Sequence, residues 1–439
     1  MEIKDIKPGS YVNLHTKTGD FECTILESPK PEIILIKLNS GYNIGIREED
    51  ILDIKILNKN EPLGKVPKLP KIIKKEAKKE INNLPKIVLI ATGGTISSRL
   101  DTKTGAVKWL TNPEELLKVY PELLDIVQIE KIEVPFMKAS ENMSFSDWSK
   151  IAEVAEKHLN DTKIDGIIVT HGTDFLGYSA AALSFAFRSL NKPVVLTYSQ
   201  RSSDRASSDA RLNLICAARA ASSEIAEVML VGHANSSDDF CYALPGTKVR
   251  KMHSSRRDTF RPINSTPLAK IWSDKIEIMK EYKIKDKGKK IKVFPKFSDK
   301  VALIKFYPGQ DPEILEHYLS EGYKGLVIEM SGLGHVLTGE AKNNWLPKLK
   351  KVIKSGMVIC AAPQTLYGKL DPYVYSVGRE IQDTGVIYLR DMLPETAFVK
   401  LGWVIGNFGN KDKNKVKLEM LKNISGEYNP KISEKEFLN

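Results

Sequence analysis

The feature that most restricts the fold of this sequence is an alternation of short apolar runs with helical segments, which begins at Lys86. The apolar runs have the length of strands and lack polar residues at alternate positions, so each predicts a parallel strand covered on both faces. They are KIVLIAT, IDGIIVT, PVVLTYS and EVMLVG in a first block, then VALIKF, GLVIEM, MVICAA and VIYL in a second. This alternation is typical of a doubly wound α/β fold.

The helical segments between these runs are marked by cap signals and apolar stripes. In SFSDWSKIAEVAEKHL, Ser144 and Asp147 are placed to cap the N-terminus of a helix. One face of that helix would carry Trp148, Ile151, Ala152, Ala155 and Leu159. Further helices are expected near residues 111–124, 179–190, 207–222 and 339–354, and from about Pro312.

Residues 1–57 show a different pattern, in which short β-rich runs are separated by turn signals. YVNLHTK and FECTILES flank TGD, while IILIKL and YNIGI flank NSG. Four or five short strands in so short a segment predict a small barrel, because closing the sheet removes its exposed edges. The sequence therefore predicts four parts: a β-barrel docking domain at 1–57, a basic linker at 58–85, an N-terminal α/β catalytic domain at 86–297 and a smaller C-terminal α/β domain at 298–439.

The formal net charge of +11 is concentrated in two stretches. Residues 59–86 and residues 280–300 each contain nine lysines and three acidic residues, which gives +6 apiece and leaves the remainder close to neutral. Both stretches contain Pro, Gly or Asn, so they are expected to be linkers or exposed hairpins. Their lysines are either solvated or in contact with a polyanion such as RNA, which clustered lysine attracts without reading its sequence.

Several classes of protein do not fit the sequence. Cys23, Cys216, Cys241 and Cys360 show no CxxC spacing, so neither a zinc site nor a disulfide framework is expected, and a reducing cytoplasm fits. The N-terminus lacks the apolar core of a signal peptide, and no apolar run reaches the roughly 18 residues that cross a bilayer. Neither GxxxxGK[ST] nor GxGxxG occurs, which argues against a phosphate-binding loop. His171 has no second ligand at metal-binding spacing, so no metal site is expected in this chain.

Two glycine-containing turns follow predicted strands of the first block. TGGT (residues 92–95) follows IVLIA, and HGTD (residues 171–174) follows GIIVT. Ligands of open parallel sheets bind at the carboxyl ends of the strands, so Thr95 and Thr173 would face one another across a pocket if their strands are close. Either motif alone is also compatible with a simple tight turn.

A threonine hydroxyl becomes a nucleophile only when a base takes its proton. Asp174 follows Thr173 directly, but a lone carboxylate is a weak base for an alcohol. A buried lysine is a better base, because desolvation lowers the pKa of its amine, although a neighbouring carboxylate opposes that shift. A Thr–Lys–Asp cluster would therefore relay a proton, and spacing alone does not identify its lysine.

The two turns, IATGGTI and IIVTHGTD, resemble the two signatures of the L-asparaginase family. The resemblance continues through SQRSSDRASSDARLNL, KVRKMHSSRRDTFRPINSTPLA, MSGLGHV and LYGKLDPYVYSVGRE, and covers roughly residues 86–409. It implies a two-domain asparaginase-like body that hydrolyses a side-chain amide through an acyl-enzyme and releases ammonia. It further implies that Thr95 is the nucleophile and that Thr173, Asp174 and Lys251 complete the catalytic set.

The resemblance also implies the residues that bind the substrate. Ser140 and Glu141, in KASENM, match the loop that holds the α-amino and α-carboxylate groups, and Thr173 and Asp174 are implied substrate contacts as well. Backbone amides at Gly94 are expected to bind the substrate and to stabilise the oxyanion.

One position departs from the family pattern. These enzymes usually carry a tyrosine on a mobile loop some 13 residues after the first catalytic threonine, but position 108 is Lys, and no tyrosine occurs between Thr95 and Tyr120. Tyr120 itself is expected to serve in helix packing. The group that takes the proton of Thr95 is therefore not identified by the sequence.

The order of a small β domain, a basic linker and an asparaginase-like body resembles the glutamine-hydrolysing subunits of archaeal tRNA-dependent amidotransferases. That resemblance covers essentially the whole chain. It implies a glutaminase that passes ammonia to a partner subunit, with ATP and Mg²⁺ bound by the partner and no cofactor in this chain. It also implies a homodimer within a two-plus-two assembly, in the cytoplasm, that acts on a tRNA.

Two other interpretations remain open on the sequence alone. A free-standing cytoplasmic L-asparaginase would carry the same catalytic residues, with the β domain as an appendage. A catalytically silent RNA-binding scaffold would use the two basic stretches.

Overall fold

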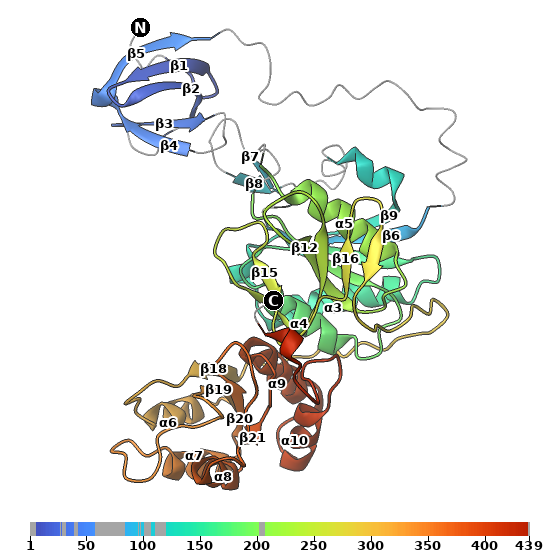
Figure 1. The fold of residues 1–439 in the computed structure, drawn as a ribbon, viewed down its shortest axis with the longest axis vertical. Helices are drawn as coiled ribbons and strands as arrows, with labels where there is room; N and C mark the ends of the chain where they lie inside the picture. Colours follow the sequence, from blue (N-terminus) through green and yellow to red (C-terminus); the bar gives the residue numbers. More distant parts are fainter. Residues whose placement is uncertain are drawn as a thin grey trace.

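The computed structural model describes most of the chain (Figure 1). The described residues are 6–26, 28, 32–38, 43–57, 84–94, 96, 98–100, 107–109, 120–201 and 207–437. Thr95, the linker at 58–83 and the main part of the helix expected at 111–124 lie outside these residues. The described end of that segment, Pro121–Asp125, is a short 3-10 helix.

The N-terminal domain is an antiparallel sheet that encloses its own core. Its strands pair in the order β4-β3-β2-β1-β5. They are β1 Tyr11–Thr16, β2 Gly19–Leu26, β3 Ile33–Leu38, β4 Asn43–Arg47 and β5 Ile51–Ile56. Val12 and Leu14 are fully buried, although the only helix among the described residues of this domain is a single 3-10 turn, Glu48–Asp50. A flat sheet could not cover these side chains, so the strands curl around them, and the expected all-β domain is confirmed.

The first α/β domain is built on a sheet of eight strands in the order β17-β16-β13-β12-β11-β10-β6-β9. The parallel strands are β6 Lys86–Ala91, β9 Gln128–Glu133, β10 Gly166–Thr170, β11 Val194–Thr197 and β12 Val228–His233. Three antiparallel strands that the sequence did not predict extend this sheet: β13 Cys241–Pro245, β16 Ala269–Ile271 and β17 Ile276–Ile278. Two separate hairpins also occur: β7 Ser98–Leu100 with β8 Val107–Trp109, and β14 Val249–Lys251 with β15 Phe260–Pro262.

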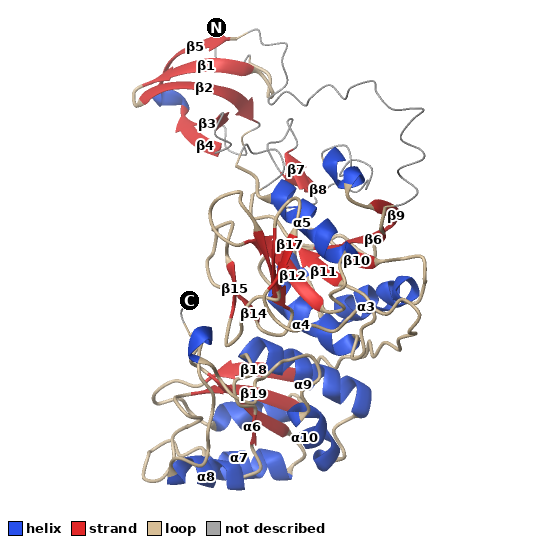
Figure 2. Ribbon diagram, turned by 45° about the vertical axis from the view of Figure 1, so that its right-hand side comes forward, coloured by secondary structure: helices blue, strands red, loops and turns tan. Residues whose placement is uncertain are grey.

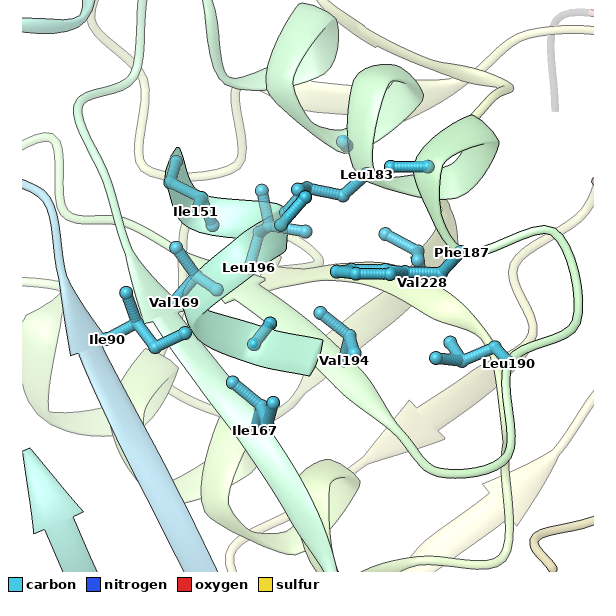
Figure 3. Close-up of a cluster of buried hydrophobic side chains, with 14 of the residues drawn as sticks. Ile90, Ile151, Ile167, Val169, Leu183, Phe187, Leu190, Val194, Leu196 and Val228 are labelled. Atoms are coloured by element: carbon cyan, nitrogen blue, oxygen red, sulfur yellow. The ribbon is translucent and has the colours of Figure 1, made fainter. Parts of the chain in front are cut away.

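Helices cover both faces of this sheet, as its continuously apolar strands require. Along β6, Ile87 and Leu89 face a core that includes residues of α5 (Ala210–Ser222). Val88 and Ile90 face the opposite core, with residues of α3 (Phe145–Leu159) and α4 (Leu176–Ala186), part of which Figure 3 shows. Full burial of each such aliphatic side chain contributes roughly 1.5–3 kcal/mol. The predicted cap of α3 is confirmed, because Ser144 and Asp147 form a capping box.

The C-terminal domain contains a parallel sheet of four strands in the order β18-β19-β20-β21. Its strands are β18 Val301–Lys305, β19 Gly325–Met330, β20 Val358–Pro363 and β21 Ile387–Tyr388. Its helices are α6 Glu313–Ser320, α7 Leu346–Lys354, α8 Ser376–Asp383, α9 Pro394–Phe408 and α10 Lys413–Leu421 (Figure 2). The helix expected from residue 339 begins at Leu346, because the Asn344 side chain accepts a hydrogen bond from the Leu346 amide and Pro347 occupies the first turn.

The two α/β domains share a hydrophobic core. Trp148 of α3 and Phe185 of α4 belong to the same buried cluster as Leu401 and Trp403 of α9. The basic stretch at 280–300 leads from one domain to the other, and Ile291 within it is buried against the first domain. Of the two expectations for this stretch, a linker or an exposed hairpin, the structure shows a linker, and Ile291 and Val293 anchor it in the core of the first domain. No helix among the described residues is both long and apolar enough to span a membrane.

Candidate active site

The two glycine-containing turns lie side by side at the carboxyl edge of the central sheet. Strands β6 and β10 pair in parallel, with Ala91 opposite Thr170. Directly after them, Thr92 donates hydrogen bonds to the Thr170 carbonyl from its amide, at 3.2 Å, and from its hydroxyl, at 2.8 Å. Thr92 is fully buried. The first threonine of TGGT therefore joins the two strand ends and has no access to a substrate.

Glycine is required where the turns touch. Gly94 has φ +83°, in the left-handed region, and a Cβ on it would lie 2.4 Å from the Gly172 amide nitrogen. Gly93, at φ +126°, would bring a Cβ to 2.2 Å from the Lys138 carbonyl oxygen. Side chains at either position would push three loops apart. Because neither residue carries a side chain, the backbone amides of this turn can come close to a ligand.

Thr173, Asp174 and Lys251 form a compact hydrogen-bonded cluster. The Lys251 Nζ lies 2.9 Å from the Thr173 Oγ1 and 2.8 Å from the Asp174 Oδ1. The Lys251 side chain is 16% exposed, whereas the Asp174 side chain is 59% exposed. Both distances are within the range for proton transfer between positioned groups. The amine is thus largely shielded, while the carboxylate faces the open side of the site.

Lys251 reaches this cluster from a hairpin rather than from the main sheet. It is the last residue of β14 and pairs with Phe260 of β15. The Phe260 ring packs edge-on against buried Tyr198, at 4.7 Å between ring centroids. In the connecting loop, Asp258 accepts hydrogen bonds from Arg256 and Arg261. Burial opposes the charge of Asp258, but these two guanidinium groups lower its pKa to about 2.

The loop that carries Ser140 and Glu141 packs against the second turn. A Cβ on Gly172 would lie 2.8 Å from the Ser140 Oγ. Ser140 is 2% exposed, and its hydroxyl finds no hydrogen-bond partner among the described residues. A buried hydroxyl normally has a partner, so this oxygen is available to a polar atom of a ligand. Glu141, in contrast, is exposed.

Lys138 fixes this loop in place. Its amide donates to the Thr92 carbonyl at 2.9 Å, and its Nζ donates to both oxygens of Asp147 at 2.9 Å. Burial would raise the pKa of Asp147, but the hydrogen bonds from Lys138 and Ser144 lower it overall. The sequence pattern identified Asp147 as a helix cap and did not identify Lys138. The ion pair connects the first turn, the Ser140 loop and α3.

His171 holds its turn in place through two hydrogen bonds. Its Nδ1 donates to the Gly172 carbonyl at 2.7 Å, and its Nε2 accepts from the Ser179 hydroxyl at 2.8 Å. The Ser179 oxygen in turn accepts from the Trp148 Nε1. Burial lowers the pKa of His171 to about 4, against the opposing effect of the Gly172 hydrogen bond. The imidazole is thus neutral near pH 7 and holds the turn that carries Thr173.

Protonation of His171 is expected to destabilise the fold in acid. Between pH 6.5 and 4 an unfolded imidazole binds a proton that the buried one does not, so the free energy of unfolding falls as pH falls through this window. The full loss is about 3 kcal/mol, from about 2.5 pKa units at 1.36 kcal/mol each. Urea unfolding at pH 7, 5.5 and 4.5 should show that His171→Asn loses this component, whereas His317→Asn, at an exposed position, keeps it. Parallel pH profiles for wild type and His171→Asn would contradict the assignment.

A cavity of about 240 Å³ lies beside the cluster, between the two α/β domains. It is lined by Asp174, Phe175, Gly177, Tyr178, Val249, Arg250, Lys251 and Glu395. Across it, Arg250 of β14 pairs with Glu395 of α9 at 3.2 Å. One residue before β14, Lys248 forms a buried ion pair with Asp391 at 2.6 Å. Both pairs tie the strand of Lys251 to the C-terminal domain, and the sequence patterns identified neither.

The predicted site residues divide into those that the structure brings together and those that it leaves undescribed. Thr173, Asp174, Lys251, Ser140 and the Gly94 backbone converge on one edge of the sheet. Thr95 lies outside the described residues.

Lys108 lies on β8, opposite Arg99, within a hairpin that follows Thr95. Tyr120 is buried in the core next to Leu123, in keeping with the packing role expected for it. Among the described residues, no group of three His, Cys, Asp or Glu side chains is arranged to hold a metal ion.

Family models match the chain in three consecutive segments. The model described as "GatD N-terminal domain" matches residues 6–57. "Asparaginase, N-terminal" matches residues 86–283, and "Glutaminase/Asparaginase C-terminal domain" matches residues 300–418. These segments contain the curled β domain, the sheet that bears the site, and most of the C-terminal domain.

Curated relatives match over almost the full length. The GatD subunit of the glutamyl-tRNA(Gln) amidotransferase of Thermococcus kodakarensis is 46% identical, and the match covers 98% of this chain and 96% of that protein. The corresponding GatD subunit of Methanococcus maripaludis is 39% identical over 97% of this chain and 99% of its own length. Among solved structures, the thermostable L-asparaginase from Thermococcus kodakarensis has a TM-score of 0.69 at 28% identity, over 79% of this chain and 100% of its own. L-asparaginase I from Vibrio cholerae has a TM-score of 0.66 at 28% identity, over 79% and 99%.

Proposed function

Because the chain belongs to the GatD family of glutamyl-tRNA(Gln) amidotransferase subunits, we propose that it is the glutaminase subunit of such an amidotransferase. In this role it releases ammonia from glutamine, and a partner subunit uses the ammonia to convert Glu-tRNA(Gln) to Gln-tRNA(Gln). The observation that carries the proposal is the Thr173–Asp174–Lys251 cluster, which lies within a chain that matches GatD proteins from end to end.

The reaction proceeds in two steps at the carboxyl edge of the sheet. The Thr95 hydroxyl attacks the side-chain amide carbonyl of glutamine, and the C–N bond breaks as ammonia leaves with a proton. Water then hydrolyses the resulting acyl-enzyme to glutamate. Backbone amides of the turn at Gly94 stabilise the oxyanion. Thr173 approaches the same carbonyl from the facing edge. Lys251, which also donates a hydrogen bond to Asp174, exchanges a proton with the Thr173 hydroxyl.

The substrate is held by the groups that surround this edge. Ser140 supplies the buried hydroxyl that has no partner among the described residues, and Glu141 and Asp174 supply carboxylates for the α-amino group. Glutamine, rather than asparagine, is the proposed amide donor, and the complex is proposed to be a carbon–nitrogen ligase because it forms a new C–N bond with the energy of ATP. A difference of one methylene is worth only about 1–3 kcal/mol in a pocket, so the preference rests on the family and not on a single residue.

The partner is proposed to be GatE, the second protein of the amidotransferase, which would bind ATP and Mg²⁺ and amidate the Glu-tRNA(Gln) that the complex binds. The sequence of this chain contains neither the GxxxxGK[ST] nor the GxGxxG motif. Two copies of this chain are proposed to pair within a heterotetramer in the cytoplasm. Tyr373, Val374 and Tyr375, each more than half exposed, form an apolar surface suited to such contacts.

The proposal is tested by copurification of the chain with its partner, followed by an amidation assay. We expect slow glutamine hydrolysis by the isolated chain, and much faster hydrolysis when partner, ATP and Glu-tRNA(Gln) are present. Vigorous asparagine turnover that no partner stimulates would instead favour a free-standing L-asparaginase. Absence of both activities would favour a silent RNA-binding scaffold.

A further inference from the structure

The lysines of the second basic stretch differ in their partners. Three in its first half are ion-paired with acidic residues of the first α/β domain, whereas Lys280 donates to the Ser265 hydroxyl. Lys283 pairs with Glu227 at 3.4 Å, Lys285 with Glu224 at 2.9 Å and Lys287 with Asp165 at 3.0 Å. Ion-paired lysines have little charge left for a polyanion, so the positive potential of the stretch must come from its later residues.

The next lysines open onto a concavity with no acidic residue in its lining. Its volume is about 600 Å³, and its cationic lining residues are Arg188, Lys289, Lys290, Lys292 and Lys422. Lys289, Lys290, Lys292 and Lys422 are exposed and form no ion pair with the described part of the chain. Lys290 donates instead to the Asn160 carbonyl. Four lysines that form no ion pair with the described part of the chain thus line one hollow, which we name the basic pocket.

Aromatic rings fix the cations at the edge of the basic pocket. The Arg188 guanidinium lies over Phe294 at 5.5 Å and over Phe408 at 5.9 Å, and Glu419 pairs with it at 3.3 Å. The Lys292 ammonium lies 5.8 Å from the centre of the Phe294 ring, and the Lys415 ammonium, on α10, lies 5.4 Å from the centre of the Phe408 ring. Stacking on rings limits the rotamers of these long side chains, so less entropy is lost when they bind a ligand.

We propose that the basic pocket binds the sugar–phosphate backbone of RNA, namely the tRNA on which the complex acts. This inference rests on the proposed function, which supplies an RNA as the substrate. Lysines without an ion-pair partner attract phosphates through the release of counterions, and the carboxylate of Glu419 at the edge of the pocket is paired with Arg188. Contacts of this kind position a nucleic acid without reading its bases, which suits a subunit whose own chemistry concerns glutamine.

The test compares two triple variants within the intact complex of both subunits. Lys289→Gln/Lys290→Gln/Lys292→Gln removes the free lysines of the pocket. Lys283→Gln/Lys285→Gln/Lys287→Gln removes the same charge from the same stretch but at ion-paired positions, and is the matched control. Affinity for unacylated tRNA(Gln) is measured from about 50 to about 300 mM salt, together with basal glutamine hydrolysis and subunit copurification.

We expect the pocket variant to bind tRNA about tenfold more weakly or worse at moderate salt. The plot of log affinity against log salt has a negative slope, and its magnitude should decrease by about 2. Each lost phosphate contact reduces that magnitude by roughly 0.7–0.9. Glutamine hydrolysis without tRNA and subunit copurification should not change, and the control should bind tRNA as the wild type does.

Three results would overturn the inference. Equal losses in the two triple variants would mean that net charge alone matters. An unchanged slope in the pocket variant would mean that the pocket lysines do not contact phosphate. Loss of copurification would assign the pocket to a protein interface. A wild-type complex without glutamine-dependent amidation would refute the proposed function, whereas an active complex whose pocket variant binds tRNA normally would refute only this inference.

Discussion

Lys251→Met is expected to reduce glutamine-dependent amidation about 10³-fold, which corresponds to about 4 kcal/mol of transition-state stabilisation. Methionine keeps most of the length of the lysine side chain but has no amine. The Lys251 Nζ is the only group in the described part of the chain that hydrogen-bonds the Thr173 hydroxyl, and it also holds Asp174. Its removal takes away the proton-transfer partner and leaves the fold of the hairpin intact.

The measurement uses the complex with two nitrogen sources. Amidation with glutamine as nitrogen source should be lost, whereas amidation with added ammonium should remain, because the partner subunit carries out the amidation step at a separate site. Thr95→Val should give the same separation, since it deletes the proposed nucleophile with little change in volume. Lys157→Met, at an exposed position, is the control and should behave as the wild type. Loss of the ammonium reaction as well would mean that the substitution disrupts the complex rather than the glutaminase.

Asp391→Asn is expected to destabilise the protein by about 3–5 kcal/mol, because it leaves the Lys248 ammonium buried without a counter-charge. Both side chains are 1% exposed, and the second Asp391 oxygen accepts from the Asn429 amide at 3.0 Å. Burial lowers the pKa of Lys248, and Asp391 opposes that shift. Without the carboxylate, the lysine must either lose its proton or move out of the domain interface.

Denaturant unfolding, followed by tryptophan fluorescence, measures this loss. Glu122→Gln removes a carboxylate from the exposed pair with Arg211 and should cost less than about 1 kcal/mol. The double variant Lys248→Met/Asp391→Leu should recover most of the stability, since apolar replacement of a buried pair is often neutral. A loss in Asp391→Asn no larger than in Glu122→Gln would show that the pair is not desolvated in solution.

The parallel strands other than β9 could be predicted because burial on both faces leaves a continuous apolar run. Strand β9, with the sequence QIEKIE, is only partly buried, has no such run and was not predicted. Helix α9 was not predicted, since PETAFVKLGWVIGNF is apolar around most of its circumference and has no single stripe. It packs between α4 and β19, so two neighbours demand apolar residues from it. The antiparallel strands β16 and β17 are three residues each, too short to carry a recognisable alternation.

The candidate site was only partly accessible from sequence. The pattern placed both glycine-containing turns at the carboxyl ends of parallel strands but left open whether those strands are neighbours, and the structure shows that β6 pairs with β10. Lys251 is 77 residues from Asp174 and is one among 66 lysines and arginines, so only family resemblance selected it. The Lys138–Asp147 ion pair was only partly indicated by the sequence. The pattern identified Asp147 as a helix cap, but it did not show that the carboxylate also pairs with the lysine nine residues before it.

The hairpin that carries Lys251 is held at two points by the C-terminal domain, through Arg250 with Glu395 and Lys248 with Asp391. The position of the amine therefore depends in part on the C-terminal domain, through Asp391 and through Glu395 of α9. A ligand whose affinity depends on the position of α9 must, by thermodynamic reciprocity, alter the affinity of the site for any substrate that depends on Lys251, and the substrate must alter the affinity for that ligand by the same factor. A protein that docks on the second domain would thereby govern glutamine turnover without contributing a single atom to the site.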